Sequence, residues 1–409
     1  MTANTLFIII VAIYVIDFAF SRYLSWRNIK ASSLPIPEEL SGIYDEERYR
    51  KQQDYLRINS KLGLVASTFS FVIIMAMLLL KGFALIDGFV AGWTLHSTLH
   101  SIVFFAILYI ANDLLQLPFA IYDVFVVEER FGFNRTTPTT FILDKLKGYL
   151  LTAVIGGGIL WTIITIFNLT PEYFWLLAWG VVTLFSLIMG TFYSNIIVPL
   201  FNKQTPLEEG PLRIKIEEFS QKVGFNLQNI YTIDGSKRSS KANAYFTGMF
   251  GKKRIVLYDT LIAKMTEEEI VAVLSHEIGH CKHRHTLKNM LITFPANLLL
   301  FWLLSIVLGS DLFAQAFGVV QASFHINILV FGILYTPIST ALDIAMSALS
   351  RRFEYQADEF SKNNGQAEAL ISALRKLAKD SLSNLTPDSL VVKVSYSHPT
   401  LYQRIKALI

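Results

Sequence analysis

The sequence has little charge and almost no cysteine. Charged residues make up 17% of the 409 residues, whereas hydrophobic residues make up 53% and the mean hydropathy is +0.44. Soluble domains carry roughly 25% charged residues, so this composition excludes an ordinary cytosolic enzyme and a disordered chain. The single cysteine, Cys281, excludes a disulfide scaffold because it has no partner for an internal bridge. The net charge of +4 is too small to indicate a nucleic acid partner.

Long apolar stretches are abundant instead. A membrane helix needs about 20 mostly apolar residues, and seven windows qualify. We therefore predict an all-α polytopic membrane protein with seven transmembrane helices. The first window has no basic segment before it and no small-residue cleavage site after it, which favours a retained helix over a signal peptide. The windows are residues 5–21, 62–86, 101–123, 149–168, 174–200, 289–309 and 326–349.

The basic residues lie on one side of the predicted membrane. Of the 36 Lys and Arg residues, 35 fall in four segments, and two apolar windows lie between each of these segments and the next. The connections within these pairs of windows would lie on the opposite side of the membrane, and they contain no Lys or Arg. The positive-inside rule places these four segments in the cytosol and the N-terminus outside or in a lumen. The four segments are residues 22–61, 124–148, 201–288 and 350–409.

One short motif indicates metal chemistry. Residues 276–280 read His-Glu-Ile-Gly-His, and a capping-box pattern at Thr266 and Glu269 predicts that they lie on a helix. Two histidines four positions apart share one helix face and can hold one metal ion. The intervening Glu277 lies beside them and is suited to act as a base toward a water molecule. A second pair with this spacing, His96 and His100, has no such glutamate, so we interpret it as interfacial packing.

A catalytic zinc ion usually has three protein ligands, so a third is needed. Glu354 and Asp358 are four residues apart on a predicted helix. One of these carboxylates could bind the metal while the other orients a ligand histidine. The alternative is a solvated helix face with Arg351 and Arg352 as salt-bridge partners.

The remaining histidines have less specific surroundings. We predict that His283 and His285 are surface residues at a helix end, and that His325, at the start of a helix, is structural. His398 lies in a Ser-His-Pro segment and could donate a hydrogen bond to a developing oxyanion. The alternative for His398 is a surface turn before the last helix.

Two short runs predict β-strands around a glycine-rich turn. They lie near Asn243–Gly248 and Arg254–Tyr258. A strand beside a zinc-binding helix often offers its edge to an extended peptide, and Asn243, Ala244 and Tyr245 are the candidate residues. A hairpin without substrate contact is the alternative.

Together these features resemble the type I CAAX prenyl proteases, an integral-membrane family of zinc metalloproteases of the gluzincin type. The resemblance covers most of the chain, including the seven windows. The stretches that carry it are Glu128-Glu129-Arg130-Phe131-Gly132-Phe133-Asn134, Ser236–Gly248, His276–His280, Glu354–Asp358 and Ser397-His398-Pro399 with Arg404.

The resemblance implies a role for each of these site residues. The implied metal ligands are His276, His280 and Glu354, which would hold one Zn²⁺ per chain, and the implied catalytic base is Glu277. The other implied residues are His398 and Arg404 for transition-state contact and positioning, with Asp358 in support, and Asn243, Ala244 and Tyr245 for the substrate edge.

The resemblance also implies an architecture and an activity. The seven helices would surround a hydrated chamber, and a cytosolic zincin domain with a small β-hairpin or sheet would cap it. The enzyme would remove the last three residues of a C-terminal C-a-a-X sequence after prenylation of its cysteine. The predicted parts are helices 1 to 5 with their loops in residues 1–200, the catalytic domain in 201–288, helices 6 and 7 in 289–349, and a tail completing the catalytic domain in 350–409.

We therefore predict a monomeric zinc endopeptidase that acts on prenylated peptide or protein substrates in contact with membrane lipid. Its length, short for a eukaryotic member, favours a bacterial cytoplasmic membrane, with the endoplasmic reticulum membrane if the source is eukaryotic. A quality-control metalloprotease is one alternative. A transporter or channel with a degenerate protease site is another, because Asp17, Asp113 and Asp343 lie within the apolar windows. We expect at least two of these aspartates to face a hydrated cavity.

Overall fold

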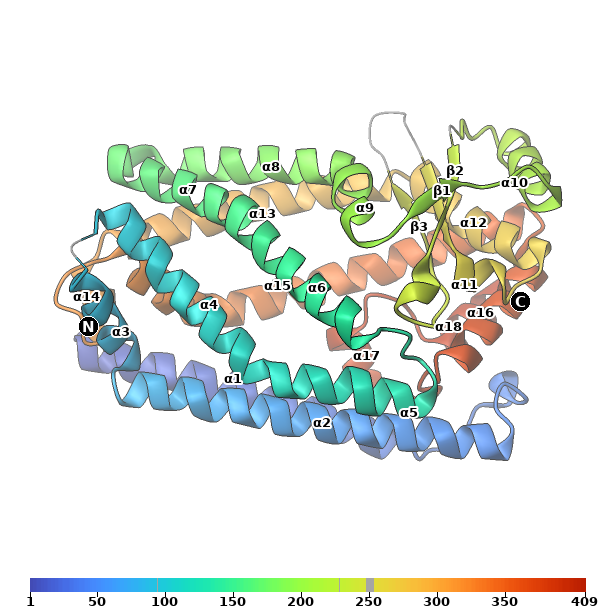
Figure 1. The fold of residues 1–409 in the computed structure, drawn as a ribbon. Coiled ribbons are helices and arrows are strands. Elements are labelled where there is room, and N and C mark those ends of the chain that lie inside the picture. Colours follow the sequence, from blue (N-terminus) through green and yellow to red (C-terminus); the bar gives the residue numbers. More distant parts are fainter. Residues whose placement is uncertain (94, 228, 248–253) are drawn as a thin grey trace.

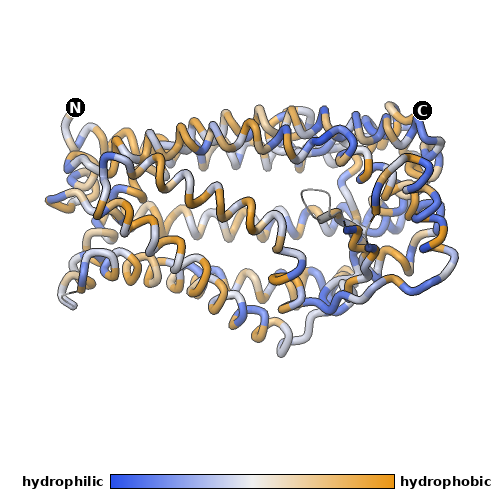
Figure 2. The backbone as a smooth tube through the Cα atoms, turned by 90° about the horizontal axis from the view of Figure 1, so that it is seen from above, coloured by the Kyte–Doolittle hydropathy of each residue, from blue (hydrophilic) through white to orange (hydrophobic). Residues whose placement is uncertain are grey.

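The computed structural model describes residues 1–93, 95–227, 229–247 and 254–409. Seven of its helices are long and apolar enough to cross a membrane, which confirms the predicted number. Apolar residues follow these helices, whereas polar residues gather at the end of the molecule that contains the C-terminus (Figures 1 and 2). The seven spans are α1 (Ala3–Ala31), α2 (Glu46–Leu79), Ser97–Phe131, Pro138–Leu169, Pro171–Phe201, α13 (His285–Leu308) and α15 (Phe324–Asn363).

Three of the spans contain more than one helical element. Two of them include a short π-helical segment, and the third begins with a 3-10 turn. The elements are α4 (Ser97–Tyr122), η2 (Asp123–Glu128), α5 (Glu129–Phe131), α6 (Pro138–Leu151), η3 (Thr152–Gly156), α7 (Gly157–Leu169), η4 (Pro171–Tyr173), α8 (Phe174–Ile196) and α9 (Val198–Phe201).

The second predicted window, 62–86, extends beyond the helix that it identified. Helix α2 ends at Leu79, and Lys81 adopts a left-handed conformation with φ of 55°. A residue other than glycine is uncommon in that region, and it turns the chain into a separate short helix, α3 (Gly82–Ala91). Hydropathy continues across this turn, so the window could not detect it.

The spans bury few of their own residues. Between 6% and 22% of the most apolar window of each span is buried. Most side chains of the spans are therefore not covered by other parts of the described chain, and the hydrated chamber stays a prediction. Asp113 lines a pocket of about 330 Å³ and is paired with two residues of α6, Lys145 at 2.5 Å and the Tyr149 hydroxyl at 2.5 Å. Asp17 and Asp343 are exposed.

A four-stranded sheet lies at the polar end of the molecule (Figure 1). Its strands are ordered β1-β2-β4-β3, with β2 and β4 parallel and both outer pairs antiparallel. The two predicted strands are β3 and β4, and the predicted turn between them lies largely outside the described residues. Strands β1 and β2 were not predicted from the sequence. The strands are β1 (Gln204–Pro206), β2 (Asn229–Ile233), β3 (Ala244–Thr247) and β4 (Arg254–Tyr258).

Shorter helices pack around this sheet. Helix α12 begins at the predicted capping box, in which Thr266 and Glu269 bond each other's backbone. One hydrophobic core joins β4, α10 and α12, and includes Phe219, Leu257 and Leu274. The elements of the chain whose bounds are not yet given, of which α14 lies at the opposite end of the molecule, are η1 (Glu38–Leu40), α10 (Pro211–Lys222), η5 (Gly235–Lys237), α11 (Asp259–Ile262), α12 (Glu267–Lys282), α14 (Asp311–Ala316), α16 (Ala367–Asp380), α17 (Ser389–Ser395) and α18 (Leu401–Leu408).

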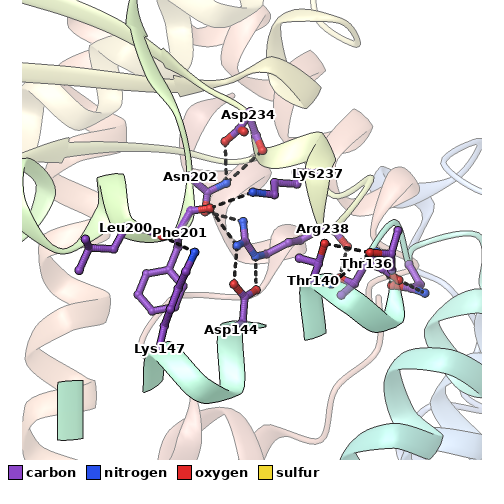
Figure 3. Close-up of polar contacts among 12 residues, drawn as sticks. Thr136, Thr140, Asp144, Lys147, Leu200, Phe201, Asn202, Asp234, Lys237 and Arg238 are labelled. Carbon is purple, nitrogen blue, oxygen red and sulfur yellow. Dashed lines mark hydrogen bonds and ion pairs between the residues drawn. The ribbon is translucent and has the colours of Figure 1, made fainter. Parts of the chain in front are cut away.

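A polar cluster fastens the sheet to the membrane helices (Figure 3). The Arg238 guanidinium, just after η5, donates to both Asp144 oxygens of α6 at 2.7 and 2.8 Å. It also donates to the Phe201 carbonyl and the Asn202 side-chain oxygen, both at 2.9 Å. Asn202 in turn donates to the Asp234 carboxylate at 2.9 Å. These contacts fix the chain that leads into edge strand β3.

Candidate metal centre

The centre forms where α12 crosses α15. Gly279, inside the His-Glu-Ile-Gly-His motif, lies at the crossing. A Cβ atom at this position would be 2.9 Å from the Ala357 Cα and 3.1 Å from the Ala357 carbonyl oxygen. Only a residue without a side chain permits this approach. The close crossing brings Glu354 of α15 against the two histidines of α12.

His276, His280 and Glu354 direct their polar atoms at one point. The two histidine Nε2 atoms are 3.2 Å apart. Glu354 Oε2 lies 3.3 Å from His276 Nε2, and Glu354 Oε1 lies 3.2 Å from His280 Nε2. The His276 and Glu354 side chains are 8% and 5% exposed, and His280 is 25% exposed. One side of the cluster therefore remains accessible.

These residues fit a zinc ion. Tetrahedral zinc with bonds of about 2.0–2.1 Å separates its ligand atoms by about 3.3 Å. The distance between the two Nε2 atoms agrees with this value, and so does the distance from each of them to one oxygen of Glu354. Two imidazoles and a carboxylate are also a usual ligand set for catalytic zinc. Glu354 Oε2 is buried and has no hydrogen-bond donor in the part of the chain described. A buried carboxylate oxygen without a partner is costly, and a cation at this point would satisfy it.

Asp358 and Arg404 support His276 from behind. The Asp358 carboxylate lies 2.8 Å from His276 Nδ1, so Nδ1 carries the proton and Nε2 is left for a metal. Arg404 of α18 holds both Asp358 oxygens, through Nε at 2.8 Å and a terminal nitrogen at 2.6 Å. Burial lowers the pKa of Arg404, but the Asp358 carboxylate outweighs that effect and raises the pKa above its ordinary value. The charged pair therefore orients His276 without leaving a buried charge uncompensated.

His285 supports His280, and its predicted surface position was wrong. His285 is 3% exposed, and its ring stacks on Phe353 at 4.1 Å. Its Nε2 is 2.8 Å from Gln356 Oε1, which only accepts, so Nε2 carries the proton. His285 Nδ1 therefore accepts from His280 Nδ1 at 2.9 Å, which leaves His280 Nε2 for a metal. The signal in the sequence was the five-residue spacing from His280 into the next helix.

We expect His285→Ala to weaken zinc binding at this centre by about 10–100-fold, because His280 loses the acceptor that fixes its tautomer. Competition with a chelating dye in detergent measures the affinity. His283→Ala is the matched control, since this half-buried neighbour contacts His285 by ring stacking, at 5.5 Å. Equal zinc affinity in His285→Ala and His283→Ala would show that His285 does not position the ligand.

The two predicted catalytic residues lie around the centre. Glu277 follows His276 on α12 and is half-buried. His398 Nε2 is 3.3 Å from Glu354 Oε1, and its side chain is 61% exposed. The Ser397 hydroxyl contacts the other ring nitrogen of His398 at 2.8 Å. His398 thus faces the centre from the accessible side and is not confined to a remote turn.

The candidate substrate edge lies beside a pocket. β3 is an outer strand of the sheet, and the Tyr258 N–H donates to the Asn243 carbonyl at the start of β3. Asn243 is exposed, and Ala244 and Tyr245 follow it along the edge. A pocket of about 830 Å³ lies next to these residues. Its lining comes from α8, β3 and the α12–α13 junction, and includes Tyr193, Asn243, Tyr245, Cys281, Thr286 and Met290.

Comparisons with known proteins cover the whole architecture. Residues 25–203 match the family model described as CAAX prenyl protease N-terminal, five membrane helices, and residues 206–409 match the model of peptidase family M48. The CAAX prenyl protease 1 homolog of Oryza sativa is 36% identical over 96% of this chain and 95% of its own. CAAX prenyl protease 1 of Saccharomyces cerevisiae is 36% identical over 98% and 94%. The crystal structure of S. mikatae Ste24p superposes with a TM-score of 0.94 at 34% identity, covering 98% and 99%.

Proposed function

The chain belongs to the CAAX prenyl protease 1 family of M48 zinc metallopeptidases, and on this premise we propose that His276, His280 and Glu354 hold one zinc ion at which prenylated C-a-a-X proteins are cleaved near their C-terminus. The observation that carries the proposal is that the two histidine Nε2 atoms lie 3.2 Å apart and that each lies 3.2–3.3 Å from an oxygen of Glu354, spacings that suit tetrahedral zinc. Peptide hydrolysis also needs a base, which is Glu277, and access for water and substrate, which the open side of the cluster provides.

Each residue has a separate task in the proposed mechanism. Zinc, when bound, supplies Lewis acidity that polarises a carbonyl and lowers the pKa of water. Glu277 accepts the proton of the attacking water and later gives it to the leaving amine. His398 donates from Nε2 to the oxygen of the scissile carbonyl as it becomes negative. Asp358 and His285 hold the two ligand histidines in the tautomer that keeps Nε2 available.

We propose that the substrate adds to the sheet along β3. Asn243, Ala244 and Tyr245 lie at this outer strand, and the backbone groups on its outer edge would bond an extended peptide. The adjoining 830 Å³ pocket receives the prenylated C-terminal segment. Apolar residues such as Met189, Phe246 and Met290 line it together with the polar Asn243, which suits a lipid-modified peptide.

Cleavage of a synthetic peptide ending in a farnesylated C-a-a-X sequence tests this function. Purified wild-type protein should release the terminal tripeptide, detected by mass spectrometry, and should cleave the same peptide without the farnesyl group much more slowly. Equal cleavage of both peptides would contradict a prenyl-binding pocket. Cleavage of misfolded membrane proteins without any cleavage of the farnesylated peptide would favour a quality-control protease.

The protein is a multi-pass integral membrane protein. We propose that residues 201–288 and 350–409 form one cytosolic domain and that the N-terminus lies outside or in a lumen. Packing of α12 against α16, with Leu274 and Ala373 in one core, supports the joint domain. The chain spans 95% and 96% of the rice and Arabidopsis thaliana relatives, so its length does not separate it from eukaryotic members. These relatives favour the endoplasmic reticulum membrane over a bacterial one.

The topology predicts opposite labelling of two matched cysteines. Gln221 on α10 and Gln321 before α15 are both exposed. In sealed vesicles and a Cys281→Ser background, Gln221→Cys should react with a membrane-impermeant maleimide only from the cytosolic face. Gln321→Cys should react only from the opposite face, because all but one of the basic residues lie in the cytosolic segments. Labelling of both cysteines from one face would contradict the seven-span arrangement.

A further inference from the structure

A second histidine cluster lies at the end of the molecule that carries α3 and α14, remote from the sheet (Figure 1). Asp87 of α3, His100 of α4 and His325 of α15 converge there. Nε2 of His100 and Nε2 of His325 are each 2.8 Å from the same oxygen of Asp87, and the two rings stack at 4.9 Å. The predicted packing role of His100 and structural role of His325 do not account for this convergence on one carboxylate oxygen.

Two imidazoles contact the charged side chain of Asp87. In the described parts of the chain, both of its ion pairs are to imidazoles, and no Lys or Arg reaches it. The Asp87 side chain is 17% exposed and that of His325 is 4% exposed. The carboxylate is therefore left without a fixed positive partner.

The contacts around His325 allow the tautomer that a metal ligand needs. When the Ser101 hydroxyl donates to the Ser97 carbonyl, 3.2 Å away, it can accept a hydrogen bond from His325 Nδ1 at 3.0 Å. With the proton on Nδ1, the lone pair of Nε2 faces the Asp87 oxygen at 2.8 Å. A lone pair and a carboxylate repel each other at that distance unless a cation lies between them. That cation is a second proton or a metal ion.

We propose that Asp87, His100 and His325 bind a divalent transition-metal ion, a site distinct from the catalytic centre and beyond the proposed function. Two imidazoles and one carboxylate are a ligand set of zinc and its first-row neighbours. The ligand atoms all lie within 4.8 Å of one another. Around a tetrahedral ion, the two 2.8 Å contacts between a histidine Nε2 and the Asp87 oxygen would lengthen to about 3.3 Å.

The neighbouring contacts give this site the outer partners that metal ligands usually have. Ser101 fixes the ring of His325 through Nδ1, and Phe104 packs against that ring at 4.5 Å. His100 and Asp87 are 18% and 17% exposed, so water can complete the coordination and the ion can enter. A bound ion would join α3, α4 and α15. Helix α15 would then contribute a ligand to each centre, His325 and Glu354, which are about 44 Å apart along the helix axis at 1.5 Å per residue.

Counting zinc in the purified full-length protein tests the proposal. Protein loaded with zinc in detergent and freed of loosely held ions should contain two zinc ions per chain by mass spectrometry. Asp87→Asn and His325→Ala should each contain one, whereas Glu354→Ala should lose the other. His96→Ala is the matched control, because His96 is exposed and lies one helical turn before His100 outside the cluster. It should retain two.

Two results would overturn the site. One is a wild-type protein that holds a single zinc ion, lost in Glu354→Ala and unchanged in Asp87→Asn. The other is a second zinc ion that persists in Asp87→Asn, His325→Ala and His100→Ala alike. His100→Ala changes a partly exposed position, so it remains informative if His325→Ala does not fold. If Asp87→Asn lost a zinc ion and Glu354→Ala did not, the assignment of the catalytic centre would be wrong, whereas the site at Asp87 would be supported.

Discussion

Glu277→Gln is expected to keep the zinc of the catalytic centre and to cleave a farnesylated C-a-a-X peptide about 10²–10⁴-fold more slowly than the wild type. Glu277 lies next to His276 on α12, but the three ligand atoms come from His276, His280 and Glu354. Glutamine has nearly the shape of glutamate and cannot accept the proton of water. The loss should therefore appear in turnover and leave zinc content intact.

A control on the same helix separates this effect from a general loss of negative charge. Glu268 is exposed and forms a surface pair with Lys215 at 2.5 Å. Exposed ion pairs contribute little to stability, so Glu268→Gln should fold like the wild type. Because Glu268 is not one of the residues of the metal centre, this variant should also retain wild-type turnover. Near-normal turnover in Glu277→Gln would remove its assignment as the base. Loss of zinc in Glu277→Gln would instead mean that Glu277 acts as a ligand.

The sequence predicts the parts of this protein that depend on local spacing. Apolar length identifies the seven spans, and the capping box at Thr266 identifies the start of α12. The His-Glu-Ile-Gly-His motif identifies a ligand pair because an i, i+4 spacing lies on one helix face. Glu354 and Asp358 are found the same way. These inferences need only the geometry of a single helix.

Contacts between distant segments are not encoded by spacing and were missed. Strand β2 pairs in parallel with β4, 25 residues later, and neither its five residues nor those of β1 alternate clearly. His285 acts on His280 only because Arg284, with φ of 55°, turns the chain between α12 and α13. His325 meets Asp87 across 238 positions. Each depends on tertiary packing that a single sequence does not display.

Glu354→Ala is expected to lower zinc affinity at the catalytic centre far more than Asp358→Ala, although both carboxylates lie on α15 one turn apart. Glu354 offers oxygens 3.3 Å and 3.2 Å from the two histidine Nε2 atoms, so its loss removes one of three ligands. Asp358 contacts only the far nitrogen of His276, at 2.8 Å, and its loss should weaken binding by about 10–100-fold. The loss in Glu354→Ala should exceed that range.

Zinc titration against a chelator of known affinity ranks the two variants, and circular dichroism checks that both remain helical. Asp358→Ala also leaves Arg404, whose side chain is 12% exposed, without its counter-charge, so a lower unfolding temperature is expected for this variant. Asp358→Asn retains an acceptor for His276 Nδ1 and should recover part of the zinc affinity. The reverse ranking, with Asp358→Ala losing zinc and Glu354→Ala retaining it, would mean that the ligand and the orienting carboxylate are exchanged. Because the three variants alter one carboxylate each, stability and affinity can be compared residue by residue.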